Sequence, residues 1–214
     1  MTDPIFVEDV HERTDGAGAG SCLTRANLLE KSVIAGGAMV VGGAVIGGLP
    51  ALATSAPSAD HDVEILNFAL LVEYLQASFY KEALARGALT GELREFARVV
   101  GSHEREHVAF IKRTLGRKAR RKPPFDFSDT TRDKDKFGPT AVTLEEIGLA
   151  AYNGQAANLT KGALAAAARI VSVEARHASW IRDILGRNPA PHATDAGLSA
   201  AKVTAAVKRT GFVT

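Results

Sequence analysis

The sequence predicts an all-α protein whose main domain is a four-helix bundle made of two similar helical hairpins. Three observations lead to this fold class. From Asp60 onward, apolar residues recur with a period near 3.6 residues, as they do in amphipathic helices. No segment shows the sustained alternation of apolar and polar residues that a half-buried strand needs. The two halves of this region also resemble each other at a nearly constant offset, which is typical of a repeated supersecondary unit.

Length and composition limit the classes of protein to which the chain can belong. Its 214 residues suit one domain with accessory segments, and 46% hydrophobic residues are enough for a core. The formal net charge of +2 provides no global field that would draw the protein to nucleic acid, so no nucleic-acid partner is expected. A single cysteine excludes a disulfide framework and a cysteine-based zinc site, but it leaves His, Asp and Glu as metal ligands.

Residues 1–59 are predicted to be an N-terminal export signal and a linker. Every residue from Val33 to Leu49 is Ala, Val, Ile, Leu, Met or Gly, and the small-x-small triplet Ala51–Ala53 follows as a cleavage site. The apolar run is shorter than a membrane span and rich in glycine, which favours cleavage over anchoring. We therefore expect a periplasmic, cell-envelope or extracellular protein that meets a membrane only through an uncleaved signal. Ala26 replaces the second arginine of a twin-arginine-like motif, so the export route stays open.

The first hairpin is predicted over residues 62–115. In the stretch 62–86 the apolar residues fall broadly along one side of a helix, and Gly87 is a stop signal. Residues 92–115 repeat this pattern, and Gly116 ends it. Residues 117–139 carry three prolines, several aspartates and no apolar period, so we expect a long connection between the second and third helices.

The second hairpin is predicted over residues 140–185. A third helix is expected from Thr140 to Leu159, opening with Thr143 and Glu146 as a capping box, and a fourth over 162–185. These boundaries place the bundle at residues 60–187. The remaining residues, 188–214, form a C-terminal extension in which 199–209 predict a short helix with little that must be buried.

An internal repeat relates the two hairpins. Residues 104–117 align without a gap to residues 174–187 at an offset of 70, with six identities in register. Upstream, Glu73 and Tyr80 recur as Glu145 and Tyr152, with the same spacing of seven, at an offset of 72. The chain is therefore predicted to contain two copies of one helical hairpin, and the difference between the offsets falls in connecting sequence.

The repeated polar residues predict a metal site inside the bundle. Each Glu-x-x-His pair lies on one face of its helix, and the two repeated glutamates lie on the core side of the other two helices. Several buried carboxylates repel one another unless cations offset their charge, so two divalent metal ions, iron or manganese, are expected. One Glu from each of two helices plus a Glu-x-x-His from each of the others is the ligand set of di-iron carboxylate bundles. The candidate ligands are Glu73, Glu104, His107, Glu145, Glu174 and His177.

With this set of residues the chain resembles the ferritin-like superfamily and, more narrowly, exported bacterial ferritin-like proteins related to desiccation-associated proteins. The resemblance covers about residues 60–186 and implies a ferritin-like four-helix bundle, export and a di-metal site. Dioxygen or peroxide are the partners that such a site would take. The motifs that carry the narrower resemblance are Leu66-Asn67-Phe68-Ala69-Leu70, Glu73-Tyr74-Leu75, Phe79-Tyr80, His103-Glu104 with His107, Leu144-Glu145, Gly148, Ala151-Tyr152 and Glu174-Ala175-Arg176-His177.

Three further residues have two interpretations each. Tyr80 and Tyr152 lie two turns from the repeated glutamates, so each hydroxyl either bonds a ligand carboxylate or bonds backbone in an ordinary core. Gln76 either donates to a ligand or lies at the edge of the site. The histidines outside the repeat, His61, His103 and His192, are predicted to be solvated or structural, and Phe110 and Trp180 to belong to the core.

Two functional hypotheses follow. In the first, an exported protein holds two metal ions and consumes an oxidant or oxidises ferrous iron. In the second, a non-enzymatic stress or desiccation protein keeps the bundle with a vestigial site and acts through its surface. The basic run 117–122 either binds an anionic partner or simply complements a helix C-terminus. No catalytic residue is assigned, and homo-oligomer formation stays open.

Overall fold

The computed structural model describes residues 56–214, which hold four long helices and one shorter helix. The predicted export signal lies outside the described residues. None of the helices in the described part is long and apolar enough to cross a membrane. The α-helices are α2 (Ala59–Arg86), α3 (Gly91–Leu115), α4 (Lys134–Gln155), α5 (Lys161–Ile184) and α6 (Ala200–Thr210), with 3₁₀ turns at Gly116–Lys118 and Ala156–Asn158.

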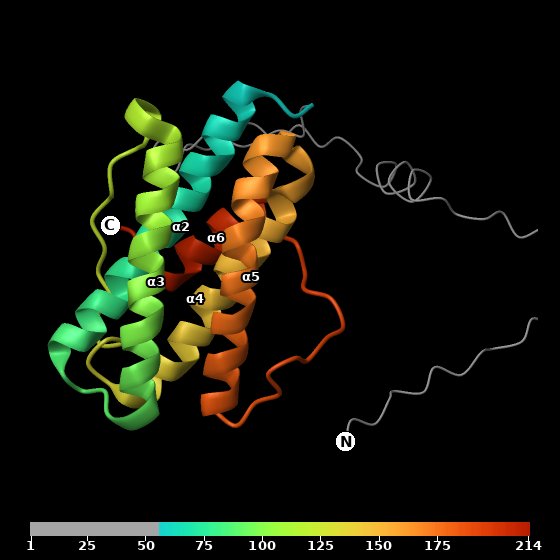
Figure 1. Cartoon of the computed structure of the whole chain (residues 1–214). Coiled ribbons are helices and arrows are strands. Elements are labelled where there is room, and N and C mark those ends of the chain that lie inside the picture. Colours follow the sequence, from blue (N-terminus) through green and yellow to red (C-terminus); the bar gives the residue numbers. More distant parts are fainter. Residues whose placement is uncertain (1–55) are drawn as a thin grey trace, which may run out of the picture. The chain divides into compact units, whose positions relative to one another are not determined.

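The four long helices form a bundle of two antiparallel hairpins. α2 packs against α3, and α4 packs against α5, while contacts of α2 with α4 and of α3 with α5 join the hairpins. The connection between α3 and α4 runs back along the length of the bundle, so that α2 and α4 are antiparallel (Figure 1). The prediction of an all-α four-helix bundle with a long connection between its second and third helices is confirmed.

Side-chain hydrogen bonds hold the starts of α2 and α5. The Ser58 hydroxyl accepts a hydrogen bond from the His61 backbone N–H at 3.2 Å, which satisfies a free donor in the first turn of α2. The carboxylate of Asp62 then accepts bonds from the backbone N–H and the hydroxyl of Thr160, at 2.9 and 2.5 Å. Because Thr160 is the N-cap of α5, this aspartate fixes the starts of two helices against each other.

The third helix begins six residues earlier than predicted, at Lys134. The carboxylate of Asp133 caps it by accepting from the Asp135 backbone N–H at 2.8 Å. Pro139 lies inside the second turn of α4, where it removes one backbone hydrogen bond. The fully buried ring of Phe137, stacked on Phe79 at a centroid distance of 5.1 Å, holds this turn by packing instead.

The predicted capping box of Thr143 and Glu146 is wrong. Thr143 lies inside α4, and its hydroxyl donates to the Pro139 carbonyl at 3.0 Å. Glu146 instead accepts a hydrogen bond from Arg182 of α5 at 2.8 Å. The helix also ends at Gln155 and not at residue 159, since a 3₁₀ turn follows it. The other long helices begin and end within three residues of their predicted bounds.

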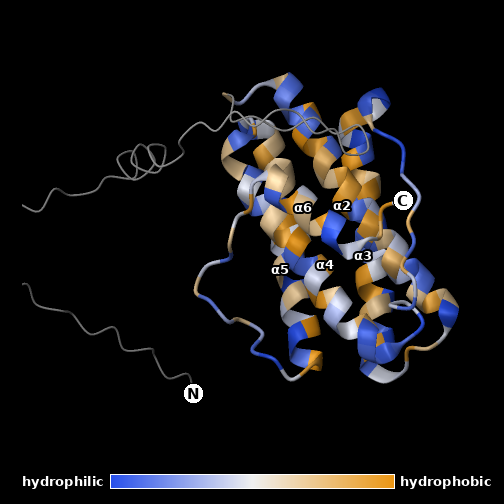
Figure 2. Cartoon of the chain, turned by 180° about the vertical axis from the view of Figure 1, so that it is seen from behind, coloured by the Kyte–Doolittle hydropathy of each residue, from blue (hydrophilic) through white to orange (hydrophobic). Residues whose placement is uncertain are grey.

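Two hydrophobic clusters flank the polar centre of the bundle, one toward each end. α3 and α5 each contribute apolar residues to one cluster before their central glutamate and to the other cluster after it, and α2 and α4 contribute to both clusters. Figure 2 shows hydrophobic and hydrophilic residues interleaved along each helix, as expected for amphipathic helices. The two clusters therefore enclose the carboxylates in a region that water reaches poorly.

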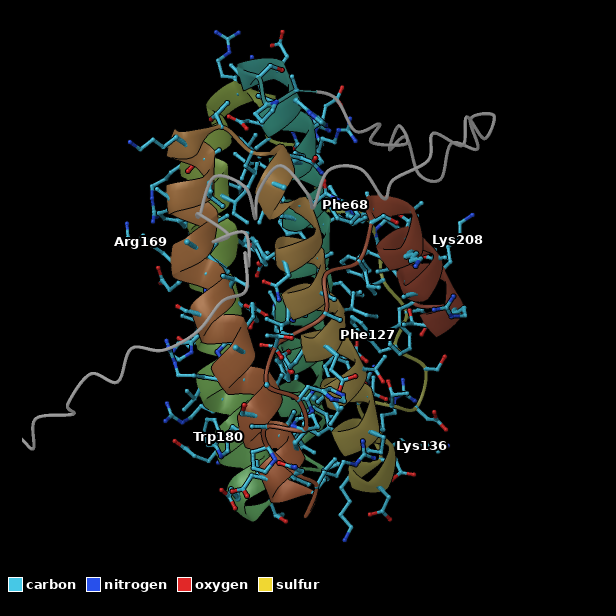
Figure 3. The ribbon with its side chains drawn as sticks, turned by 90° about the vertical axis from the view of Figure 1, so that its right-hand side faces the viewer. Phe68, Phe127, Lys136, Arg169, Trp180 and Lys208 are labelled. Atoms are coloured by element: carbon cyan, nitrogen blue, oxygen red, sulfur yellow. The ribbon has the colours of Figure 1, made fainter. Side chains whose placement is uncertain are left out.

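The C-terminal extension packs on the outside of the bundle. α6 lies on the side of α2 and α4 that faces away from α5 (Figure 3). The side chains of Val203 and Val207 are buried there, so the expectation that little of this helix is buried was wrong. The Leu198 backbone N–H bonds the Ala150 carbonyl at 2.9 Å, at a place where Gly154 offers no side chain. A Cβ on Gly154 would lie 1.8 Å from the Leu198 carbonyl oxygen, so only glycine permits this approach.

Candidate metal centre

The structure brings all six candidate ligands together in the middle of the bundle. The four carboxylates come one from each long helix and are fully buried, and the imidazoles of α3 and α5 are 8% and 3% exposed. Glu73 of α2 and Glu145 of α4, which the offset of 72 relates, are both fully buried, as the repeat predicts. The residues are Glu73 on α2, Glu104 and His107 on α3, Glu145 on α4, and Glu174 and His177 on α5.

The six side chains form two groups of four that share two carboxylates. Glu104 and Glu174 belong to both groups. The first group adds Glu73 and His107, and the second adds Glu145 and His177. Within each group, one ligand atom from every residue lies within 4.8 Å of the others. Shared carboxylates with one terminal carboxylate and one imidazole on each side suit a pair of divalent ions.

Several carboxylate oxygens in this centre have no hydrogen-bond donor. His107 Nδ1 lies 3.1 to 3.3 Å from one oxygen each of Glu73, Glu104 and Glu174, but one N–H donates to only one of them. Buried oxygens of the same three glutamates are left without a hydrogen bond. Unpaired buried oxygens are costly, and metal ions coordinate such oxygens well. The donor set therefore fits bound cations.

The buried charges shift the pKa values of these groups strongly. Burial, together with repulsion from neighbouring glutamates, raises the pKa of the Glu73 and Glu174 carboxyls from 4.5 to about 7, although contacts with His107 oppose this rise. Burial alone would lower the pKa of His177, but contacts with Glu104 and Glu145 outweigh it and raise that pKa to about 10. The same balance, with three carboxylates in contact, raises the pKa of His107. Without metal, the centre therefore retains protons that two cations would displace.

The two tyrosines bond carboxylates across the bundle. The Tyr80 hydroxyl, on α2, donates to Glu145 Oε1 of α4 at 2.5 Å. The Tyr152 hydroxyl, on α4, donates in turn to Glu73 Oε1 of α2. Each tyrosine thus contacts the glutamate of the opposite hairpin and not the one on its own helix. Burial raises the pKa of both hydroxyls well above its usual value, and the adjacent carboxylates add to this rise, so both keep their protons.

Gln76 lies inside the centre and not at its edge. Its side-chain amide is fully buried and donates to Glu145 Oε1 at 3.1 Å and to Glu174 Oε2 at 3.3 Å. It fits there because α4 carries a glycine opposite: a Cβ on Gly148 would lie 2.9 Å from both Gln76 Nε2 and Glu174 Oε2. Glycine is therefore required for this close approach of α4 to the centre.

Sequence reasoning missed His103. Its Nδ1 lies 2.9 Å from Nε2 of His177, whose other nitrogen, Nδ1, faces Glu104 and Glu145 at 3.0 and 3.1 Å. An imidazole partner on the outer nitrogen orients a ligating histidine and fixes its tautomer. The spacing of four residues to His107, which places both on one face of α3, was the available signal.

The two halves of the centre are not equivalent, although the repeat relates them. At the offset of 72, Gln76 corresponds to Gly148, and at the offset of 70, His103 corresponds to Val173. Gln76 and His103 both contact residues of the half that contains Glu145 and His177, so both differences add hydrogen-bond partners to that half. The carboxylate and imidazole of the Glu145 half receive three outer partners, Tyr80, Gln76 and His103, whereas Tyr152 is the outer partner found for the other half.

The remaining histidines and aromatic residues are separate from the centre. His192 is exposed, and His61 is buried in the first turn of α2. Trp180 and Phe110, predicted as core, are partly exposed and pack at the margins of the two hydrophobic clusters. Trp180 also donates from Nε1 to Glu92 at 3.2 Å, which joins α5 to the start of α3.

Comparison with known families agrees with this architecture. A family model described as a ferritin-like domain matches residues 61–187, which include α2 from its third residue onward, the other three long helices and all six candidate ligands. The chain belongs to the ferritin-like domain family. A search of curated proteins gave no match to the chain. The buried carboxylate and imidazole groups of this ferritin-like domain are compatible with a metal site.

Proposed function

We propose that this ferritin-like protein is exported and binds two divalent ions, iron or manganese, at its central carboxylate cluster. The observation that carries this proposal is the sharing of two buried carboxylates by two groups of ligands. Four carboxylates balance the charge of two divalent ions, and the oxygens without hydrogen-bond donors provide coordination sites. Glu73, Glu104, His107 and Glu174 would hold one ion, and Glu104, Glu145, Glu174 and His177 would hold the other.

The protein's own residues prepare the centre for chemistry with dioxygen or peroxide. Bound iron or manganese would supply the electrons for oxidant reduction. Tyr80 and Tyr152 hold the two carboxylates that are not shared, Glu145 and Glu73, by hydrogen bonds and keep their phenolic protons. The hydrophobic clusters on both sides limit access by water, which strengthens the electrostatic interactions within the centre.

Metal analysis of the purified chain tests the proposal. After loading with ferrous iron or manganese and removal of free ions, we expect close to two ions per chain. The double variant His107→Ala with His177→Ala should hold none, because each ion loses its nitrogen ligand. His192→Ala, which removes an exposed imidazole outside the centre, is the matched control and should bind as the wild type does. A wild-type chain without metal after loading would refute the proposal.

A non-enzymatic alternative is favoured by one observation: the imidazoles contact the carboxylates directly, so their positive charge offsets part of the repulsion without metal. In that case the chain would be a stress or desiccation protein with a vestigial centre. Consumption of ferrous iron or peroxide by the loaded chain discriminates between the two, since the alternative requires none. Export is tested separately by the N-terminal residue of the chain isolated from its host, which we expect to follow Ala53.

A further inference from the structure

A cavity of about 160 Å³ lies between α2, the connection that follows α3, and α6. Most of its lining is apolar and includes Phe68 and Leu71 of α2, Val207 of α6 and Val213 near the C-terminus. Figure 3 labels Phe68 beside α6 on this side of the bundle. The cavity is separate from the carboxylate centre. A cavity of about 150 Å³ with apolar walls stays dry and holds a benzene molecule, so this one has room for part of an alkyl chain.

Hydrogen bonds fix the walls of this cavity. The buried side chain of Asn67 donates from Nδ2 to the Lys118 carbonyl at 3.0 Å and accepts from the Arg120 backbone N–H at 2.8 Å. The Tyr74 hydroxyl donates to the Arg120 carbonyl at 3.3 Å. The Asp126 backbone N–H bonds the Phe212 carbonyl at 2.9 Å, which joins the connection to the C-terminus. The pocket is therefore preformed, as ligand-binding pockets usually are.

Three cations surround this apolar space. Arg120, Arg121 and Lys208 are among the lining residues, and no Asp or Glu is. Within residues 56–214, none of the three forms an ion pair with a carboxylate. Figure 3 labels Lys208 on α6. Such a site complements a molecule with an apolar chain and an anionic end.

We propose that this cavity binds a single-chain fatty carboxylate, with part of its alkyl chain inside and its carboxylate at the three cations. A membrane surface fits less well, because insertion into a bilayer needs protruding apolar side chains. Among the described residues the one large apolar side chain that is exposed is Leu164, on α5 and outside the cavity lining. The alkyl chain must therefore enter the protein.

Titration of the full-length protein with sodium octanoate, decanoate and dodecanoate tests the proposal. Each buried methylene should raise the affinity about fourfold until the cavity is full. Decyltrimethylammonium, which has the same chain length and the opposite charge, should bind at least tenfold more weakly than decanoate. Equal affinity for the two decyl compounds, binding of inorganic phosphate as tight as that of decanoate, or no binding of decanoate would each overturn the proposal. So would binding to phosphatidylglycerol vesicles in the absence of decanoate binding.

Two variants locate the site. Replacing Arg120, Arg121 and Lys208 together by Gln should lower decanoate affinity about tenfold, because exposed ion pairs contribute about two- to fivefold each. The matched control replaces three exposed cations elsewhere by Gln, at Arg94, Arg113 and Arg187, and should bind decanoate almost as well as the wild type.

Thr204→Trp, on α6, fills the space with an indole ring and should abolish decanoate binding. Its melting temperature and metal content, measured on the same sample, show that the variant is folded. A folded Thr204→Trp chain that binds decanoate with wild-type affinity would place the ligand elsewhere and refute the proposal. Likewise, an equal loss of affinity in both triple variants would show a general charge effect and overturn it.

Discussion

Gly148→Ala is the sharpest test of how closely α4 must approach the centre. The added methyl carbon would lie 2.9 Å from Glu174 Oε2 and 2.9 Å from Gln76 Nε2, whereas ordinary contacts are 3.4 to 4 Å. Both side chains must therefore move by about half an ångström, the difference between these distances. Glu174 is one of the two shared carboxylates, so this displacement affects both proposed metal positions.

The expected effects on metal binding and on stability have different sizes. Losing the support of groups around a metal ligand costs about 10- to 100-fold in affinity, so we expect a loss in this range for manganese. Stability without metal changes less: overpacking costs about 1–3 kcal/mol, while replacing a helical glycine by alanine gains back about 1 kcal/mol. The assays are calorimetric titration with manganese and thermal unfolding of the metal-free chain.

Gly162→Ala provides the matched control, because a Cβ there meets no atom within 4 Å. It changes the same residue type near the start of α5, so metal affinity should stay at the wild-type value while stability rises slightly. The reasoning is refuted if Gly148→Ala binds manganese as tightly as the wild type, or if both variants lose affinity equally.

Three further predictions concern the centre and its surroundings. His103→Val, which copies the residue at the equivalent position 173, should weaken the tighter of two manganese-binding steps about 10- to 100-fold in a calorimetric titration; an unchanged first step would contradict the inequivalence of the two halves. The metal-free chain should lose stability as the pH rises from about 5 to 8. The reason is that Glu73 and Glu174, with pKa values near 7, retain protons that the unfolded chain releases near 4.5, and His177, near 10, extends the loss above pH 6.5. Melting temperatures should fall over this range without metal and stay nearly level with it; a parallel fall in both would count against neutralisation by metal. Finally, Gly154→Ala should detach residues 197–198 from α4, with faster amide exchange at Leu198 and about 1–3 kcal/mol lost in unfolding; wild-type exchange would exclude this packing.

The helical class, the two-hairpin repeat and the identity of the six central residues could all be predicted from the amino-acid sequence. Apolar periodicity follows from burying one side of each helix, and a repeated Glu-x-x-His is readable because both residues of each pair lie on one helical face. The start of α4 was not readable in this way. Its first turns are held by the packing of Phe137 on Phe79, from another helix, which outweighs the local signal of Pro139.

The pairing of the residues around the ligands could not be predicted from the sequence, because it depends on how the helices pack. The donation of each tyrosine to the opposite hairpin, the contact of His103 with His177, and the fit of Gln76 against Gly148 all join residues of different helices. Periodicity reports which face of a helix is buried, but the rotation and spacing of neighbouring helices decide which side chains meet. Those two quantities arise from the packing of the whole core, so no single segment of the chain encodes them.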